Sequence, residues 1–189
     1  MGKTRLCFGL FVPDLRSNPV HERETMAMPV QGTQIEARLA TRDDLAGLEA
    51  IETDRTEGLS ASYLNLQEKG DFYVVVGLVD GKVMGRAILD ARTRNELVPE
   101  LKLLWVVPAA RRQGLGVAIT SYLESVAAQL GYDEIFLGVT PDNPAAIPLY
   151  ISLDYTPTGE HRSAVNVSVV DAEVASATEA IYRKSLRLR

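Results

Sequence analysis

The stretch of sequence that decides the fold is VVPAARRQGLGVAITSYLESVA, residues 106–127, in which an apolar run is followed by an amphipathic one. Between the two lies RRQGLG, residues 111–116, a polar segment with two glycines that favours a sharp turn over helix or strand. After the turn, apolar residues recur at helical spacing over about four turns, and Gly131 ends the pattern. The stretch therefore predicts a strand, a glycine turn and a long helix.

Apolar patterns on both sides of this stretch predict the remaining elements. Upstream, residues 35–39 alternate as a strand does, and residues 72–89 are β-branched and aromatic around the turn DGK, which predicts a hairpin. Residues 101–107 predict a buried strand, and Asn143 is placed to open a short helix that contains Pro148. The predicted order is β-α-α-β-β-β-α-β-α-β-β. This order indicates an α+β domain in which four helices flank a mixed, largely antiparallel sheet of seven strands.

Composition sets limits on the classes of function. The chain has 189 residues, a formal net charge of −5 and 46% hydrophobic residues, which fits one globular domain, residues 35–189, with an extension at residues 1–34. The negative charge argues against broad binding to nucleic acid. One cysteine, two histidines and no long apolar run predict no disulfide, no metal, no membrane span and a cytoplasmic location.

The glycine turn could serve a ligand or only connect two elements. A phosphate-binding P-loop requires a Lys-Ser/Thr pair that is missing here, and a dinucleotide fingerprint requires a small residue where Ile119 stands. A plain connection stays open, because glycine suits any sharp turn. The alternative is an anion site, since the first amides of a long helix attract negative charge and Arg111 and Arg112 stand beside them. A pyrophosphate would suit such a site.

Two motifs in this sequence resemble those of the GCN5-related N-acetyltransferase (GNAT) family. Arg111, Gly114 and Gly116 match the family's acetyl-CoA signature R/Q-x-x-G-x-G/A. Residues 142–157, DNPAAIPLYISLDYTP, are similar to the family's second motif, although Asp-Tyr replaces its usual Gly-Phe. The resemblance extends over about residues 35–189.

The resemblance implies a sheet that splays open to hold acetyl-CoA as the cosubstrate. The strand end would offer backbone groups to pantetheine, the glycine turn and the start of the helix would hold the pyrophosphate, and Asn143 would bond the pantetheine arm. The residues implied in acetyl-CoA binding are Trp105, Val106, Val107, Arg111, Arg112, Gln113, Gly114, Leu115, Gly116, Val117, Ala118 and Asn143.

The resemblance also implies transfer of an acetyl group to a primary amine of a small molecule or peptide. Tyr150 stands at the family's general-acid position, and Glu100 matches a position that acts as base, through water, in some branches. Other branches carry a glutamate where this chain has Gly138. The alternatives are an exposed strand-end carboxylate for Glu100, a packing role for Tyr150, and a catalytically silent CoA-binding module for the whole protein. Residues 53–62 and 159–178 would form the acceptor site, and the resemblance also allows a homodimer.

Overall fold

A computed structural model describes residues 32–53, 56–92, 96–140, 143, 145–164 and 177–187. The chain divides into residues 1–32 and residues 33–189, and the account below concerns the second unit. The predicted extension at residues 1–34 lies outside the described residues except for its last three.

The second unit is built on a seven-stranded sheet with the order β1-β2-β3-β4-β5-β7-β6. Neighbouring strands are antiparallel except for the parallel pair β4 and β5. The predicted element order and the mixed α+β sheet are confirmed. The elements are β1 (Ile35–Leu39), α1 (Leu45–Glu49), α2 (Leu59–Gln67), β2 (Phe72–Val79), β3 (Lys82–Asp90), β4 (Glu100–Val106), α3 (Leu115–Gln129), β5 (Glu134–Val139), α4 (Ala146–Ser152), β6 (Thr156–Ala164) and β7 (Ala177–Ser185), with short 3-10 turns at Arg42–Asp44 and Pro108–Ala110.

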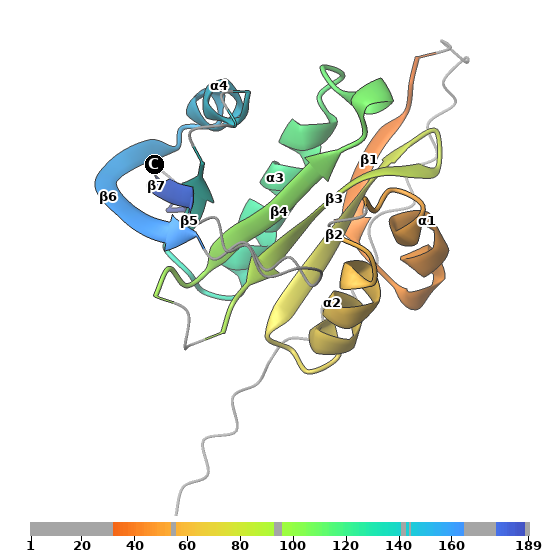
Figure 1. Cartoon of the computed structure of the whole chain (residues 1–189), viewed down its shortest axis with the longest axis horizontal. Helices are drawn as coiled ribbons and strands as arrows, with labels where there is room; N and C mark the ends of the chain where they lie inside the picture. The colour runs from red at the N-terminus through yellow and green to blue at the C-terminus, as the bar shows by residue number, and fades with distance from the viewer. Residues whose placement is uncertain are drawn as a thin grey trace, which may run out of the picture. The chain divides into compact units, whose positions relative to one another are not determined.

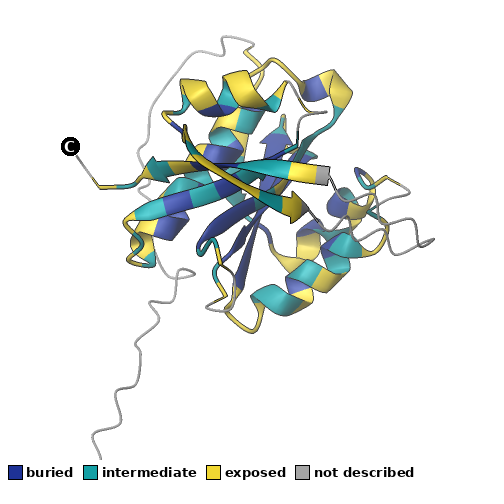
Figure 2. Ribbon diagram, turned by 60° about the vertical axis from the view of Figure 1, so that its left-hand side comes forward, coloured by how far each residue is buried: buried dark blue, intermediate teal, exposed yellow. Residues whose placement is uncertain are grey.

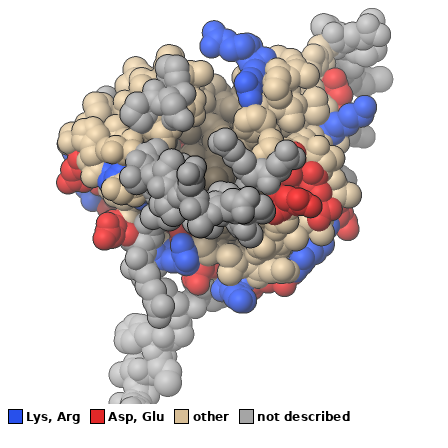
Figure 3. All heavy atoms as spheres, viewed as in Figure 1, with Lys and Arg blue, Asp and Glu red and all other residues tan. Residues whose placement is uncertain are grey.

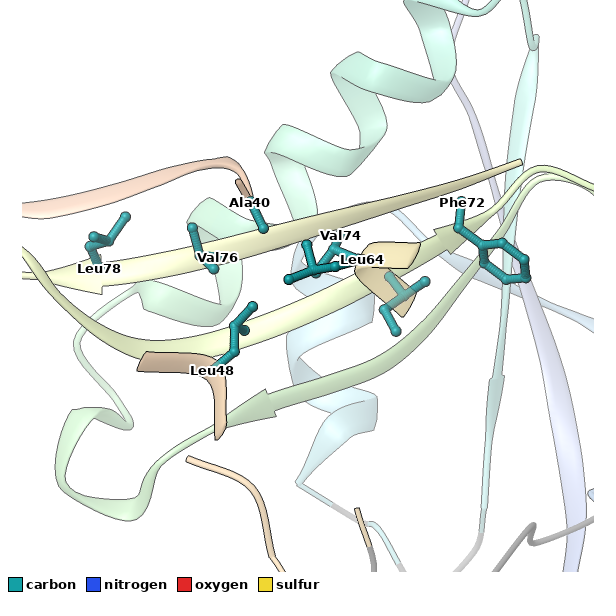
Figure 4. Close-up of a cluster of buried hydrophobic side chains, with 8 residues drawn as sticks. Ala40, Leu48, Leu64, Phe72, Val74, Val76 and Leu78 are labelled. Atoms are coloured by element: carbon teal, nitrogen blue, oxygen red, sulfur yellow. The ribbon is translucent and has the colours of Figure 1, made fainter. Parts of the chain in front are cut away.

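One face of the sheet packs against α1 and α2. Because side chains alternate along a strand, Phe72, Val74 and Val76 of β2 all point to this face. There they meet Leu48 of α1 and Leu64 of α2 in a buried cluster, which Figure 4 shows in close-up. Each of these side chains is at most 3% exposed. This cluster fixes α1 and α2 on the sheet.

The opposite face packs against the long helix α3. Leu115 and Ile119 of α3 lie against Gly77 of β2 and Gly85 of β3, where a Cβ atom would come within 3 Å of the Ile119 side chain. Figure 2 shows buried strands, in dark blue, in the middle of the molecule, among them β2 and β3. The two glycines let the helix approach the strands closely, so the start of α3 is held firmly over the sheet.

The parallel pair β4 and β5 separates soon after it begins. Glu100 lies opposite Phe136 and Leu101 opposite Leu137, and the pairing ends there. Two residues later Leu103 takes a positive φ of 55° and is 43% exposed, so the prediction that residues 101–107 form a buried strand throughout is wrong. The physical reason is that β4 no longer pairs with β5 here and that Leu103 lies in an irregularity of its pairing with β3. Figure 1 shows β4 and β5 diverging; we call this opening the fork.

The helix α4 begins later than the sequence predicts. Asn143 does not cap it; the helix starts at Ala146, after a turn in which the Ala146 amide donates to the Asn143 carbonyl at 3.1 Å. Pro148 is therefore the third residue of the helix, where an amide has no helical partner in any case. Residues 146–152 form a single helix, with Pro148 in its first turn.

Candidate functional site

The start of α3 presents free amides at one side of the fork. Gly114 precedes the helix with a φ of 90°, a left-handed conformation that suits glycine. The first helical hydrogen bond runs from the Ala118 amide to the Gly114 carbonyl, 3.0 Å away. The amides of Leu115, Gly116 and Val117 consequently have no helical partner and point out of the helix end, where the helix dipole favours an anion.

Arg111 and Arg112 are exposed beside this helix end, as the sequence predicts. The Arg111 guanidinium lies over the Trp105 ring, 4.9 Å from its centre, and its Nε donates to the Val106 carbonyl at 2.9 Å. Gln113 folds back to donate to the Ala109 carbonyl at 2.9 Å. Arg111 is thus held in place against β4, and its charge adds to that of the helix end.

The three residues expected to meet pantetheine differ in what they can offer. The amide of Val107 donates to the Met84 carbonyl at 3.0 Å, and its carbonyl accepts from Ala110 at 2.9 Å. Both backbone groups of Val107 are therefore engaged within the protein. Trp105 and Val106 pair with β3 on one side of β4 and lie past the last residue paired with β5 on the other. This edge of β4 therefore has no strand partner toward the fork, although the Val106 carbonyl already accepts from Arg111.

The helix α4 lies close to the start of α3. A Cβ atom on Gly116 would be 3.5 Å from the Leu149 side chain of α4. Next along α4, Tyr150 is 6% exposed and packs edge-on against Tyr155, with ring centres 5.5 Å apart. Burial raises the pKa of the Tyr150 phenol well above its ordinary value, so the phenol carries its proton at neutral pH. Asn143 is exposed before this helix.

Glu100 is fully buried at the start of β4, so the alternative of an exposed strand-end carboxylate is wrong. It forms ion pairs with Arg162 of β6 and with Lys102, the latter at 2.9 Å. The carboxylate is buried because two cations from different strands neutralise it. It lies where β4 and β5 are still paired, at the closed end of the fork.

Sequence reasoning missed two residues beside Glu100. Arg162 bridges Glu100 to Glu179 of β7, and the Arg162 Nη2 lies 2.9 Å from the Glu179 Oε2. The Glu179 carboxyl lies over Gly138 of β5. An isolated glycine in a strand often marks a place where another group approaches closely, so Gly138 was the signal that could have found them.

A second buried ion pair lies on the α1 and α2 side of the sheet. Arg86 of β3 is 2% exposed, and its guanidinium lies 4.0 Å from Glu52 and 3.3 Å from the Ser60 hydroxyl. Burial lowers the pKa of Arg86. Glu52 in turn accepts the amides of Gly58 and Ser60 at the start of α2, at 2.8 and 2.7 Å. This pair anchors the described part of the predicted acceptor segment 53–62 to the sheet.

Figure 3 shows the surface hollowed between the α4 side and the β4 side of the fork, with basic side chains at the end where β4 leads to α3. Within the described ranges, no group of three or more His, Cys, Asp or Glu side chains is placed to hold a metal. None of the helices in these ranges is long and apolar enough to cross a membrane.

Comparisons with solved structures show the same fold in several acetyltransferases. An N-acetyltransferase from Staphylococcus aureus Mu50 matches with a TM-score of 0.64 and 19% identity, over 82% of this chain and 99% of that one. The yncA protein of Salmonella typhimurium, solved with its cofactor acetyl-CoA, matches with a TM-score of 0.65 and 22% identity, over 82% and 96%. The ribosomal-protein-S18-alanine N-acetyltransferase of Escherichia coli matches with a TM-score of 0.62 and 21% identity, over 82% and 96%.

No curated protein sequence matches the chain. A family model does: the model described as "Acetyltransferase (GNAT) family" matches residues 40–155, which run from the end of β1 through α4 to Tyr155. The match covers the fork, the start of α3 and the helix that carries Tyr150. The chain therefore belongs to the GNAT family of acetyltransferases.

Proposed function

We propose that the protein transfers the acetyl group of acetyl-CoA to a primary amine of a small molecule or peptide. The observation that carries this proposal is the fork itself. The strands β4 and β5 part after Leu101 and Leu137, and the far end of β4 leads through a short turn to the free amides of Leu115, Gly116 and Val117. An extended ligand can therefore lie between the strands with its anionic end at the helix.

The residues present fit acetyl-CoA. The open backbone edge at Trp105 and Val106 suits the amide groups of pantetheine, and the start of α3 with Arg111 and Arg112 suits a pyrophosphate. Gly116 leaves the helix end bare of side-chain atoms. When bound, acetyl-CoA supplies an activated thioester carbonyl to the site.

The reaction requires a neutral amine, which attacks the carbonyl carbon so that a C–N bond forms and the C–S bond breaks. The departing sulfur then needs a proton. We assign this proton to Tyr150, because its helix contacts the start of α3 and its phenol keeps its proton at neutral pH. No hydrogen bond from the Tyr150 hydroxyl to another described residue competes with this role.

The test is thiol release from acetyl-CoA in the presence of polyamines, aminoglycosides, amino acids and peptides, with calorimetric titration of acetyl-CoA alongside. Release with at least one amine supports the proposal. Binding of acetyl-CoA without thiol release in the presence of any of these amines would contradict the proposal and favour a catalytically silent binding module.

Replacing the phenol tests the proposed acid. Tyr150→Phe should lower kcat by about 10²–10⁴-fold, because a general acid contributes that much, and should leave the Kd for acetyl-CoA nearly unchanged. Tyr155→Phe is the matched control: it removes the hydroxyl of the neighbouring ring, which is buried and has no hydrogen-bond partner within the described residues. An unchanged kcat in Tyr150→Phe would remove this residue from the mechanism.

A further inference from the structure

The carboxyl group of Glu179 occupies the place where a side chain at position 138 would lie. A Cβ atom on Gly138 would clash with Oε2 of Glu179 and would lie 2.9 Å from the Glu179 Cδ. The reason is the register of β5 and β7, in which Gly138 lies opposite Ile181. Glu179, two residues from Ile181, shares its face and reaches diagonally over the bare glycine.

This carboxyl group lies at the point where the fork opens. Gly138 follows Leu137, the last residue of β5 that pairs with β4. The group is on the face of α1 and α2, because Arg162 joins it to Glu100, and Glu100 lies opposite Asp90, which lies opposite Phe72 on that face. The helix α4, which carries Tyr150, contacts the start of α3 on the other face of the sheet through Leu149.

Arg162 holds one oxygen of the Glu179 carboxylate. Its Nε and Nη2 donate to Oε2 at 3.0 and 2.9 Å, while Oε1 has no hydrogen-bond partner among the described residues. The Glu179 side chain is 19% exposed, whereas that of Glu100 is fully buried. Glu179 is therefore oriented by one oxygen and open to water or ligand at the other.

The charged groups around Glu179 come from β6, which is next to β7, and from β4, which lies beyond β5. Arg162 of β6 contacts it directly, and Glu100 and Lys102 of β4 lie behind Arg162 as an ion pair of their own. β5 contributes no side chain there, because the residue is Gly138. Glu100 faces two cations and has no exposed surface, so of the two carboxylates only Glu179 can reach a substrate.

We infer that Glu179 accepts the proton of the incoming amine, directly or through one water, and that Arg162 and Glu100 are positioning residues. The inference rests on the proposed function. The ammonium gives one proton to Glu179; its nitrogen then attacks the thioester carbon, the C–N bond forms and the C–S bond breaks. The departing sulfur takes the proton of Tyr150. The nitrogen, now bonded to the acetyl group, loses a second proton, which reaches Tyr150 through solvent and restores the phenol. Glu179 releases its proton to water.

The experiment compares two acceptors that differ in their need for a base. One is the alkylamine selected from the amine panel, which is protonated at pH 7; the other is hydroxylamine, which is already neutral. Glu179→Gln should lower kcat/KM for the alkylamine by about 10²–10⁴-fold and should change the rate with hydroxylamine little. The loss should shrink as the pH rises toward the amine's own pKa, about 10.4 for an alkylammonium such as lysine.

A second variant moves the carboxylate back onto β5. Gly138→Glu combined with Glu179→Ala puts the new Cβ atom where the present carboxyl group lies, so that the new carboxylate extends from β5 into the space freed by the alanine. This double variant should recover at least tenfold in kcat/KM for the alkylamine over Glu179→Ala alone. Arg162→Met and Glu100→Gln should each lower the alkylamine rate more than the hydroxylamine rate, which a loss of folding alone would not do.

Glu36→Gln is the matched control, since Glu36 is an exposed glutamate on β1, at the opposite edge of the sheet. Equal losses with both acceptors in Glu179→Gln, or an unchanged pH profile, would overturn the inference while leaving the proposed function intact. Absence of thiol release by the unmodified protein with every amine would overturn the proposed function, and this inference with it.

Discussion

The two edges of β4 are paired very differently. Toward β3 the antiparallel register runs along the strand, from Asp90 opposite Glu100 to Gly85 opposite Val106. Toward β5 the parallel register ends at Leu101 opposite Leu137. The same strand therefore belongs to a closed core on one edge and to an open fork on the other. Sequence changes on the closed edge should alter stability, and changes around the fork should alter ligand binding instead.

The largest expected effect lies on the closed edge. Leu89→Ala removes a fully buried side chain of β3 and should lower the free energy of unfolding by about 2–5 kcal/mol, through lost burial and the cavity left behind. Leu103→Ala, at a position of β4 that is 43% exposed, should change it by less than about 0.5 kcal/mol. Urea unfolding measures both values, and similar losses would show that both edges are packed alike.

A pair of glycines sharpens the comparison. Gly77→Ala would bring a Cβ atom to 2.6 Å from the Ile119 Cδ1 and 2.8 Å from the Leu115 Cδ1, both in the core under α3, and should lower stability by about 1–3 kcal/mol. Gly116→Ala meets only Leu149, at an ordinary 3.5 Å, and alanine favours a helix.

Gly116→Ala should therefore keep or raise stability while weakening acetyl-CoA binding by about tenfold, the loss expected when one charged hydrogen bond is disturbed. Thermal unfolding and calorimetry on the same samples separate the two quantities. Tight acetyl-CoA binding by Gly116→Ala would contradict the placement of the pyrophosphate at this helix end.

The smallest effect concerns acid stability. The hydrogen bonds from Arg38 hold the pKa of the 8% exposed Asp44 below its ordinary value. A lowered folded-state pKa stabilises the fold above the unfolded pKa of about 3.9, and this contribution is lost as the pH falls through the folded value. Asp44→Asn should thus narrow the stability difference between pH 7 and pH 3.

The control is Asp133, which lies just before β5. Arg187 also lowers the pKa of Asp133, but this pair is largely exposed, at 61% and 72%, and solvent screens it. Asp133→Asn should leave the pH dependence of unfolding unchanged. The midpoints of urea unfolding at pH 7 and pH 3 measure both effects. An equal effect of the two substitutions would contradict the difference expected between the half-buried Asp44 pair and the exposed Asp133 pair.

The sequence predicts local structure well because local structure depends on near neighbours. The hairpin around Gly81 and the turn at Gly114 both follow from positive φ values that glycine allows, and the period of the apolar residues distinguishes strand from helix. The start of α4 was misplaced at Asn143, because a favourable cap does not oblige a helix to begin there.

The charged part of the candidate site could not be predicted in the same way. Glu100 and Arg162 are 62 residues apart in the sequence. They meet because the sheet brings β4 and β6 to either side of β5 and β7, and because Gly138 of β5 leaves room for the Arg162 side chain. Whether a carboxylate at a strand end is buried or exposed depends on such distant partners. Gly138 marks the close approach, but the sequence does not tell which side chain fills the space.

The register of β7 has a consequence for how this protein can diverge. From Glu134 opposite Ser185 to Val139 opposite Ala180, β5 and β7 are paired without a break. Inserting or deleting one residue between Glu179 and the part of β7 that pairs with β5 would turn the Glu179 side chain to the other face of the sheet, away from Arg162. We expect homologues to vary the length of the segment between β6 and β7 freely, while the spacing from Glu179 to the end of β7 stays constant.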